Sequence, residues 1–201
     1  PVYLIDNSEV SELLLADFED CQRQAGQLGV ELRLIHGQGN VGYGAAHNLI
    51  INNLESGFHL MLNPDVVLDR QFLDAGINYL IDHDDVAVAV PMASHENCER
   101  QFLCKRYPSV LTLFVRGFLP SNLHKFFIKR LASYEMRDLH DAQINRDIPI
   151  GSGCCMLSRS SMLKAVHGFD ERYFLYFEDF DLSLRIRQQG RIAYLPTMKI
   201  V

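Results

Sequence analysis

The sequence predicts an α/β fold whose central sheet is mostly parallel and flanked by helices. Four short apolar segments, at 2–6, 31–36, 58–62 and 86–90, have the residue pattern of buried or alternating strands. Helical segments separate these strands one by one, which is the order typical of a parallel sheet. A content of 48% hydrophobic and 22% charged residues in 201 residues is ordinary for one soluble globular domain.

The first half of the chain alternates regularly between strands and helices. After the strand VYLID at 2–6, Ser8 is a suitable N-cap for a helix that Gly26 and Gly29 end. The alternating segment ELRLIH at 31–36 then leads into a glycine-rich loop. The elements expected after this loop are a helix over 45–54, a strand over 58–62, a helix over 69–81 and a strand over 86–90, which Pro91 stops.

The second half is less regular. Pro108 begins a helix, Pro120 breaks it, and a second basic helix continues to about Ala132. The later elements are a strand over 148–158 with an embedded Gly-Ser-Gly, a short helix over 160–166, a helix from near Glu178 to a glycine cap at Gly190, and strands over 191–195 and 199–201. No repeat or low-complexity linker divides the chain, so we expect a single domain over 1–201 with a central insertion.

Composition argues against several classes of protein. No apolar run approaches the ~20 residues that a membrane span needs, and no segment of the sequence has the pattern of a signal peptide. The five cysteines form no CxxC pair, so we expect reduced thiols in a cytoplasmic protein. None of the eight histidines stands at metal-ligand spacing, which argues against a zinc site.

The charge is distributed unevenly. Between Arg100 and Arg137 lie eight basic residues and a single acid, Glu135, whereas the rest of the chain has 11 basic and 24 acidic residues. Phenylalanines and leucines are interleaved with these bases. This mixture suits an anionic membrane surface or a lipid phosphate, and we expect no nucleic-acid partner. The alternative is a solvated basic face over a hydrophobic core.

The segment 168–190 concentrates acidic and aromatic residues. Glu178, Asp179 and Asp181 fall within four residues of one another, among five aromatic residues between 173 and 180. Apolar surroundings raise the pKa of a carboxyl and make it a better base near neutral pH, so this segment is a candidate for a catalytic base. The alternative is structural, because acids in a first turn complement the helix dipole and Asp181 with Arg185 forms an ordinary i,i+4 pair.

Polar residues follow three of the predicted strands. Asp6, Asn40 and Asp65 all fall at or just beyond strand ends, where parallel sheets bind ligands, and their placement favours a nucleotide-like ligand. In Asn63-Pro64-Asp65, an acid facing a diphosphate would bind Mg²⁺ or Mn²⁺ through hard oxygen ligands. The same three residues also suit a simple turn.

Two glycine-rich loops allow more than one interpretation. Gly37, Gly39 and Gly42 satisfy G-x-G-x-x-G between a strand and a helix, which is the dinucleotide fingerprint, although here a strand and a helix precede it. The glycines also permit a tight turn and close approach to another ligand. The second loop, Gly151-Ser152-Gly153, suits the acceptor side of a cleft or a bulge within a strand.

Taken together, these residues resemble the inverting, family 2-type glycosyltransferases with a GT-A fold, over nearly the whole chain. The pairing of LNPD with YFEDFDL is most similar to the rhamnosyltransferase-like branch, which builds O-antigen and other bacterial surface polysaccharides. The matching segments are YLIDNS at 3–8, NVGYGAAHN at 40–48, LNPD at 62–65, GSGCCMLSR at 151–159 and GFDERYFLYFEDFDLSLRIRQQG at 168–190.

The resemblance implies a role for each matching residue. Asp179 would be the catalytic base that deprotonates the acceptor hydroxyl, with Glu178 as neighbour or alternate. Asp65 would be the last acid of the family's metal motif, in which Asn63 here replaces the first acid. The implied nucleotide-binding residues are Asp6, Asn7, Asn40 and Gly42, and the implied acceptor-side residues are Gly151, Ser152 and Gly153. The domain would then comprise a nucleotide-binding half over 1–92, a basic-aromatic insertion over 93–147 and a catalytic half over 148–201.

The sequence departs from the family in two ways. Members begin with one further apolar strand, which lies centrally in the sheet, and this chain shows neither that strand nor an initiator Met. We therefore expect it to be a fragment of a longer protein. Members also often have a His soon after the last strand, and the sequence stops at Val201, so that residue is not observed.

The function expected from this resemblance is transfer of a sugar, rhamnose in this branch, from a nucleoside-diphosphate donor such as a dTDP- or UDP-sugar. The cofactor would be Mg²⁺ or Mn²⁺. The acceptor would be a glycan, carried on a polyprenyl diphosphate at the cytoplasmic face of the inner membrane, with peripheral contact through 100–137. Two alternatives stay open: an NAD(P)-dependent oxidoreductase that uses Gly37, Gly39 and Gly42, and a non-catalytic module that binds glycan or membrane.

Overall fold

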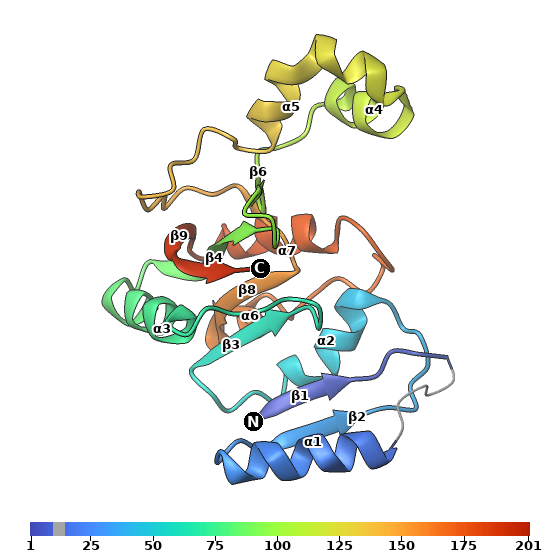
Figure 1. The fold of residues 1–201 in the computed structure, drawn as a ribbon, viewed down its shortest axis with the longest axis vertical. Helices are drawn as coiled ribbons and strands as arrows, with labels where there is room; N and C mark the ends of the chain where they lie inside the picture. Colours follow the sequence, from blue (N-terminus) through green and yellow to red (C-terminus); the bar gives the residue numbers. More distant parts are fainter. Residues whose placement is uncertain (10–14) are drawn as a thin grey trace.

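The computed structural model describes residues 1–9 and 15–201, and the side chains of all of these except residues 15, 16 and 121 (Figure 1). The strands are β1 (Val2–Ile5), β2 (Leu32–Ile35), β3 (Phe58–Leu62), β4 (Val86–Ser94), β5 (Arg100–Gln101), β6 (Cys104–Lys105), β7 (Ile150–Gly151), β8 (Cys155–Arg159) and β9 (Arg191–Ile200). The helices are α1 (Leu15–Gln27), α2 (Tyr43–Ile51), α3 (Phe72–Asp82), α4 (Val110–Phe118), the 3₁₀ helix η1 (Ser121–Phe127), α5 (Ile128–Tyr134), α6 (Ser160–Ala165) and α7 (Glu178–Ile186).

These elements confirm the predicted α/β fold. The central sheet has the order β3-β8-β4-β5, and β9 pairs with β4 in parallel. Strands β1 and β2 form a separate parallel pair. The sheet is mixed because β8 runs antiparallel to both of its neighbours, β3 and β4. The predicted start of the first helix, just after Ser8, falls partly on residues 10–14, which lie outside the described residues.

Two strand boundaries differ from the prediction. Strand β4 does not stop at Pro91 but continues to Ser94. The proline is tolerated because the ladder between β4 and β8 covers only Val88 and Ala89, so Pro91 faces no β8 residue that needs its missing N–H. Strand β9 is one strand rather than two, with an irregularity where the partner of Pro91 is Leu195 and the partner of Met92 is Lys199.

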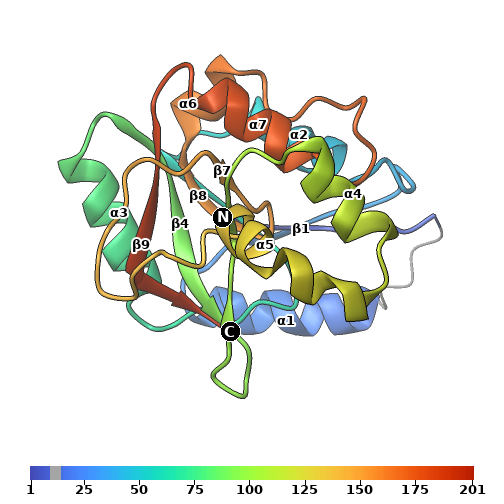
Figure 2. The same cartoon turned by 90° about the horizontal axis from the view of Figure 1, so that it is seen from above.

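The core lies on both faces of the central sheet. Residues of α2, α6 and α7, among them Ile51, Leu163 and Leu182, pack on one face with Met156 of β8. Residues of α3 pack on the other face with Leu157, the next residue of β8. This alternation is that of a strand buried on both sides. Figure 2 shows α2, α6 and α7 gathered on one side of the molecule, away from α1 and α3.

The insertion was predicted over 93–147, and in the structure the chain leaves the central sheet after β5 and returns to it at β8. Strands β6 and β7 pair with each other at its base, and α4, η1 and α5 project beyond the sheet (Figure 1). The predicted second basic helix is wrong in type, because its first seven residues form the 3₁₀ helix η1 before α5 begins. The predicted strand over 148–158 is divided into β7 and β8 by a turn at its glycines. Among the described residues, no helix has the length and apolar character that crossing a membrane requires.

Candidate active site

The helix that carries the two predicted catalytic acids begins directly after an unusual turn. Tyr176 and Phe177 both have left-handed backbone angles, with φ of 65° and 67°. Such a conformation costs a residue with a side chain about 1–2 kcal/mol, so the surrounding structure must hold the turn in place. The Asn48 side chain fixes the start of the loop that leads to this turn. Its amide nitrogen donates to the carbonyl of Phe169, and its oxygen accepts the Phe169 N–H, both at 2.8 Å.

Asp179 lies in the first turn of α7 and is bound from across the site. Its Oδ2 accepts a hydrogen bond from the backbone N–H of Gly153 at 3.1 Å. Burial raises the pKa of Asp179 above its ordinary value of 3.8, although backbone N–H groups and the charge of Lys105 oppose that shift. A carboxylate with a raised pKa is a stronger base, so Asp179 has the chemistry of a general base.

Glu178, its neighbour, is more deeply buried. Glu178 is only 7% exposed, and its Oε2 has no hydrogen-bond partner among the described residues. Burial raises the pKa of Glu178, and the negative charge of Asp179 adds to that effect. The two acids therefore differ in contact: Asp179 is hydrogen-bonded to the Gly153 turn, whereas Glu178 points into the protein.

The aromatic residues around these acids do not form the closed apolar wall that the sequence suggested. Tyr173, Phe174, Tyr176 and Phe177 are all exposed, and Tyr176 retains 73% of its surface. The Asp179 side chain is instead packed near Gly153, where an added Cβ would lie 3.4 Å from its own Cβ. The burial that raises its pKa therefore owes less to these aromatic residues than the sequence suggested.

The Gly151–Gly153 turn connects α7 to α2. The N–H of Gly151 donates to Ser183 Oγ of α7 at 3.2 Å, and the carbonyl of Gly153 accepts from the Tyr43 hydroxyl at 2.6 Å. Added side chains would clash, since a Cβ at Gly151 would lie 2.7 Å from Val90 Cγ2. The acceptor-side role of these glycines stays a prediction, and in the structure Gly153 bonds Asp179 while Gly151 bonds α7. Only Ser152, which is half-buried between them, has a side chain to offer a ligand.

The predicted metal loop lies on the other side of the same turn. The backbone N–H of Asn63 donates to the carbonyl of Cys154 at 2.9 Å, directly after Gly153, which binds Asp179. Burial chiefly raises the pKa of the Cys154 thiol, and the charges of both Asp179 and Asp65 add to that rise. Both acids are therefore near one residue, although 114 positions separate them in the sequence.

A hollow of about 140 Å³ opens beside this loop. Its lining includes Asn63, Asp65, Ser94, Gln101 and Cys154, and does not include Asp179. The described residues contain no group of three or more His, Cys, Asp or Glu side chains arranged around a metal ion. The oxygen donors here, one carboxylate with amides and a hydroxyl, nonetheless suit a hard cation such as Mg²⁺ or Mn²⁺ whose remaining ligands come from a substrate. The donor set therefore fits the expected metal through a single carboxylate.

The four predicted nucleotide-binding residues form one cluster at the end of β1. The Asn7 side chain accepts the Val41 N–H at 3.1 Å and donates to Asn40 Oδ1 at 3.2 Å and to the Gly42 carbonyl at 3.3 Å. Asp6 accepts from both the backbone N–H and the hydroxyl of Ser8. The loops after β1 and β2 are thus bonded to each other, with the exposed Asn40 at their surface.

Gly42 joins this cluster to the loop that precedes α7. Its φ is 90°, and a Cβ there would lie 2.6 Å from the carbonyl oxygen of Phe174. The next residue, Tyr43, donates its backbone N–H to that same oxygen at 3.2 Å. Gly37 and Gly39 also have positive φ but have open space where a Cβ would stand. The glycine at 42 is therefore required by packing against the chain itself, whereas the sequence predicted close approach to a ligand, which stays a prediction.

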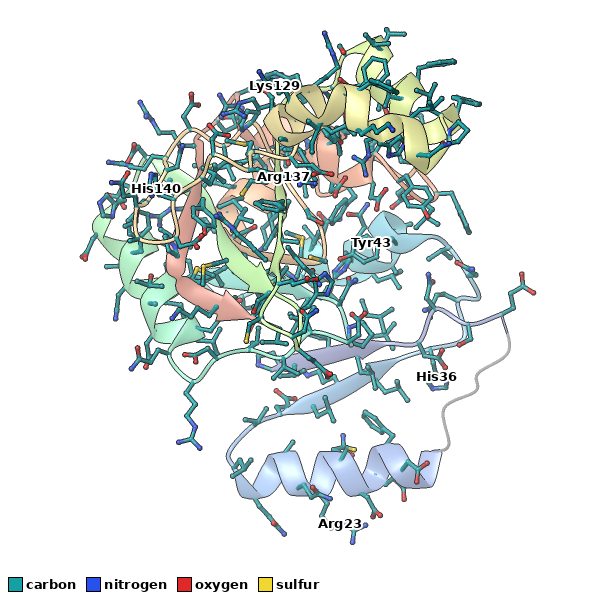
Figure 3. All side chains as sticks on the ribbon, turned by 45° about the horizontal axis from the view of Figure 1, so that its top comes forward. Arg23, His36, Tyr43, Lys129, Arg137 and His140 are labelled. Carbon is teal, nitrogen blue, oxygen red and sulfur yellow. The ribbon has the colours of Figure 1, made fainter. Side chains whose placement is uncertain are left out.

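Some important residues carry no signal in the sequence. Tyr43 in Figure 3 belongs to α2, and nothing in its spacing indicates that its hydroxyl reaches Gly153. Lys105 acts on Asp179 through its charge, yet it resembles every other base of its segment. Asp181, in contrast, forms the expected pair with Arg185 at 2.6 Å, and Arg185 also binds the carbonyls of Val166 and Gly168. Asp181 is therefore a structural residue.

Replacing Glu178 by glutamine is expected to stabilise the protein at neutral pH. Because burial raises the pKa of Glu178, the folded protein holds this proton more tightly than the unfolded chain does, and stability is lost as pH rises through the folded pKa. A neutral amide avoids that loss. The melting temperatures of the two proteins should agree near about pH 4 and diverge in favour of the variant towards pH 7. A lower melting temperature than wild type at pH 7, with the exposed Glu55→Gln unchanged, would contradict this.

Comparison with known proteins gives a consistent result. A family model described as "Glycosyltransferase like family 2" matches residues 1–200. The chain is 27% identical over 186 residues to N-acetylglucosaminyl-diphospho-decaprenol L-rhamnosyltransferase of Mycobacterium tuberculosis, covering 85% of this chain and 58% of that protein. It is 26% identical over 194 residues to the rhamnosyltransferase WbbL of Escherichia coli K12, covering 90% of this chain and 66% of that one. The chain thus spans about three fifths of the length of these relatives.

The fold is shared with solved structures of much lower sequence identity. GalNAc-T7, in a structure with UDP, GalNAc and Mn²⁺, superposes with a TM-score of 0.64 at 13% identity, covering 98% of this chain and 36% of that one. The predicted GT-A architecture of the sheet and its helices is confirmed by this likeness.

Proposed function

The chain belongs to the glycosyltransferase like family 2, and from that membership we propose that it transfers a sugar with inversion from a nucleoside-diphosphate donor. The observation that carries the proposal is the Gly153–Cys154 segment. It binds the carboxylate of Asp179 on one side and the loop of Asn63 and Asp65 on the other. Gly153 and Cys154 thereby hold two carboxylates on opposite sides. Asp179 would be the base for the acceptor, and Asp65 would bind the cation that contacts the diphosphate of the donor.

In the proposed reaction, the hydroxyl oxygen of the acceptor attacks the anomeric carbon as Asp179 takes its proton. The bond from that carbon to the diphosphate oxygen breaks, and its electron pair leaves with the nucleoside diphosphate. One base is sufficient for such a single displacement. The Gly153 N–H and the Tyr43 hydroxyl keep the base in place. Glu178, which points into the protein, serves as neighbour rather than as base.

The donor would bind between the two halves of the site. Asp6, Asn7, Asn40 and Gly42 would hold the nucleoside at the end of β1, where their loops are already bonded together. Asp65, with Asn63 beside it, would hold Mg²⁺ or Mn²⁺. Such a cation supplies positive charge to the departing diphosphate. GalNAc-T7, which shares the fold, has Mn²⁺ and UDP in its solved structure.

The names of the relatives narrow the proposed substrates. Both are rhamnosyltransferases, and one acts on N-acetylglucosaminyl-diphospho-decaprenol. We propose dTDP-rhamnose as donor and a glycan on a polyprenyl diphosphate as acceptor, at the cytoplasmic face of the membrane. Ser152 and the glycines beside it would face this acceptor from the catalytic turn. The transfer would be a step in the synthesis of a surface polysaccharide.

Calorimetric titration with dTDP, UDP, GDP and NAD⁺, each with and without Mn²⁺, tests the proposal. We expect one nucleoside diphosphate to bind, at least about tenfold more tightly with the metal, because the cation joins Asp65 to the diphosphate. Preferential binding of NAD⁺ that ignores Mn²⁺ would instead support an oxidoreductase that uses the loop of Gly37 to Gly42. Absence of binding by any nucleotide in a folded sample would favour a non-catalytic module and would overturn the proposal.

A further inference from the structure

The projecting part of the insertion, residues 107–134, is called the arm. It is closed at its base by a bond from the Arg106 N–H to the Tyr134 carbonyl at 2.8 Å. The Arg106 guanidinium adds bonds to the Ser133 carbonyl at 2.6 Å and to both carboxylate oxygens of Asp138 at 2.9 and 2.7 Å. The arm thus leaves and re-enters the protein at one point, and its helices stand clear of the central sheet (Figure 1).

The arm has a defined internal structure with a very small interior. Thr112, Val115 and Tyr134 are its only buried residues among those described. Polar contacts supply the rest: His124 bonds the carbonyls of Val115 and Leu119, both at 3.1 Å, and the Arg130 guanidinium donates to Ser109 Oγ at 3.0 Å. The helices are therefore held in a fixed arrangement by a few contacts, and most of their side chains stay outside.

Most of these outward side chains are apolar. Nine large hydrophobic residues in the described part of the arm are exposed, and Phe118 and Phe126 retain 78% and 70% of their surface. Soluble proteins rarely leave so many apolar side chains together in water without a binding role. We call the eight that lie in the helices of the arm the crest: Val110, Leu111, Leu113, Phe114, Phe118, Leu123, Phe126 and Ile128.

The charge beside the crest has a single sign. The arm contains Arg116, Lys125, Lys129 and Arg130 and no acidic residue, while the remaining residues of the chain comprise 15 basic and 25 acidic ones. The bases lie among the crest: the Lys125 ammonium is 5.3 Å from the centre of the Phe126 ring, and Lys129 directly follows Ile128. An apolar surface with bases and no acids matches a surface that is apolar inside and anionic outside.

We propose that the crest and its four bases dock the protein on an anionic phospholipid bilayer. The aromatic and aliphatic side chains would enter the boundary between head groups and acyl chains, and the bases would contact the lipid phosphates. A protein partner or a second copy of the chain would meet the same apolar side chains. An anionic membrane accounts for both features of the arm together, because its apolar interior receives the crest and its phosphates attract four bases that no acid accompanies.

The position of the arm connects this surface to the site. Lys105, just before the arm, acts on Asp179 through its charge, and Asp179 in turn contributes to the raised pKa of Tyr134, for which burial is the main cause. The base of the arm therefore lies next to the catalytic carboxylate, and the crest lies beyond it. This deepens the proposed function, on which the link to a lipid-carried acceptor rests. Docking itself requires no sugar transfer.

Sedimentation with vesicles tests the docking. Wild type should bind phosphatidylcholine vesicles that contain phosphatidylglycerol, and should bind pure phosphatidylcholine at least about tenfold more weakly, because each base near an anionic surface contributes roughly a fivefold gain. Lys125→Glu with Lys129→Glu should lower binding to the anionic vesicles at least about tenfold. Phe118→Ser with Phe126→Ser should do the same by removing apolar contact. All four side chains are exposed, so circular dichroism should show the fold unchanged.

Matched controls lie outside the arm. Figure 3 shows Arg23 far from Lys129, and Arg70 is an exposed residue just ahead of α3, so Arg23→Glu with Arg70→Glu makes the same change of charge outside the arm. Leu28→Ser removes an 81% exposed apolar side chain. These controls should bind vesicles like wild type. Equal loss in the controls, or no loss in the crest variants, would overturn the proposal. The proposal would also be overturned if light scattering showed that the wild type is a dimer and that the crest substitutions dissociate it. That result would assign the crest to contact with a second copy of the chain. Because binding is measured without donor or acceptor, its outcome is separate from that of the transfer reaction.

Discussion

Replacing Asp179 by asparagine is expected to lower kcat for sugar transfer by about 10²- to 10⁴-fold, the range that a positioned general base contributes. The amide has the same shape as the carboxylate and can still accept the Gly153 N–H, so the turn keeps its position. It cannot take the acceptor's proton. Binding of the nucleoside diphosphate, measured by calorimetry, should therefore survive while turnover is lost.

The neighbouring Asp181 provides a matched control on the same helix. Its carboxylate is paired with Arg185, which binds the carbonyls of Val166 and Gly168, so Asp181→Asn should lower the melting temperature. The folded fraction should keep turning over. If Asp179→Asn retained more than about a tenth of the wild-type rate, Asp179 would not be the base. An equal loss of kcat in both variants would mean that any change in the first turns of α7 stops the reaction.

The pH dependence of the reaction follows from the burial of the same residue. Only the ionised carboxylate accepts a proton, and burial raises the pKa of Asp179 above 3.8. The rate should therefore fall as pH drops, with its midpoint above the value of an exposed aspartate. This acid limb belongs to the two carboxyls together, because Asp179 and Glu178 are adjacent and the charge of one raises the pKa of the other.

The sequence predicted the alternating half of the fold well because hydrophobic pattern and chain order determine it. Strands β1 to β4 and the helices between them follow from short apolar runs and turn residues. The error at Pro91 has its cause in long-range pairing. Whether Pro91 ends a strand depends on where the ladder to β8 stops, and that ladder joins residues about 70 positions apart. No local pattern contains this information.

The same distinction applies to the site. Its acids and amides could be found because their residue types are unusual at strand ends and in a first turn, and because their order resembles a family. Tyr43 could not, since the contact of its hydroxyl with Gly153 spans 110 positions. The aromatic residues near Asp179 led to a wrong expectation. Their proximity in sequence suggested an apolar enclosure, whereas the left-handed turn at Tyr176 and Phe177 directs the chain outward and leaves both side chains exposed.

Replacing Asp65 by asparagine is expected to abolish the effect of Mn²⁺ on nucleoside-diphosphate binding and to lower kcat/KM by about 10³-fold, since a metal ion supplies several kcal/mol to developing charge. Among the described residues that line the hollow, Asp65 has the one side-chain carboxylate, so its loss leaves only neutral side-chain donors among them. Asp69→Asn is the matched control. Asp69 accepts the Gln71 N–H ahead of α3, a contact that asparagine also makes. This variant should respond to Mn²⁺ like wild type.

A substitution at Asn63 tests the proposed metal site by adding a carboxylate instead of removing one. Its structural contact is made by the backbone N–H, which donates to the Cys154 carbonyl, so its side chain can be changed without disturbing the turn. Asn63→Asp adds a second carboxylate to a loop that has one, and Mn²⁺ should then bind more tightly in the absence of nucleotide. If Asn63→Asp leaves metal affinity unchanged while Asp65→Asn also has no effect, the cation is held elsewhere. If only Asn63→Asp is silent, the side chain at 63 points away from the cation, and Asp65 holds it with the diphosphate alone.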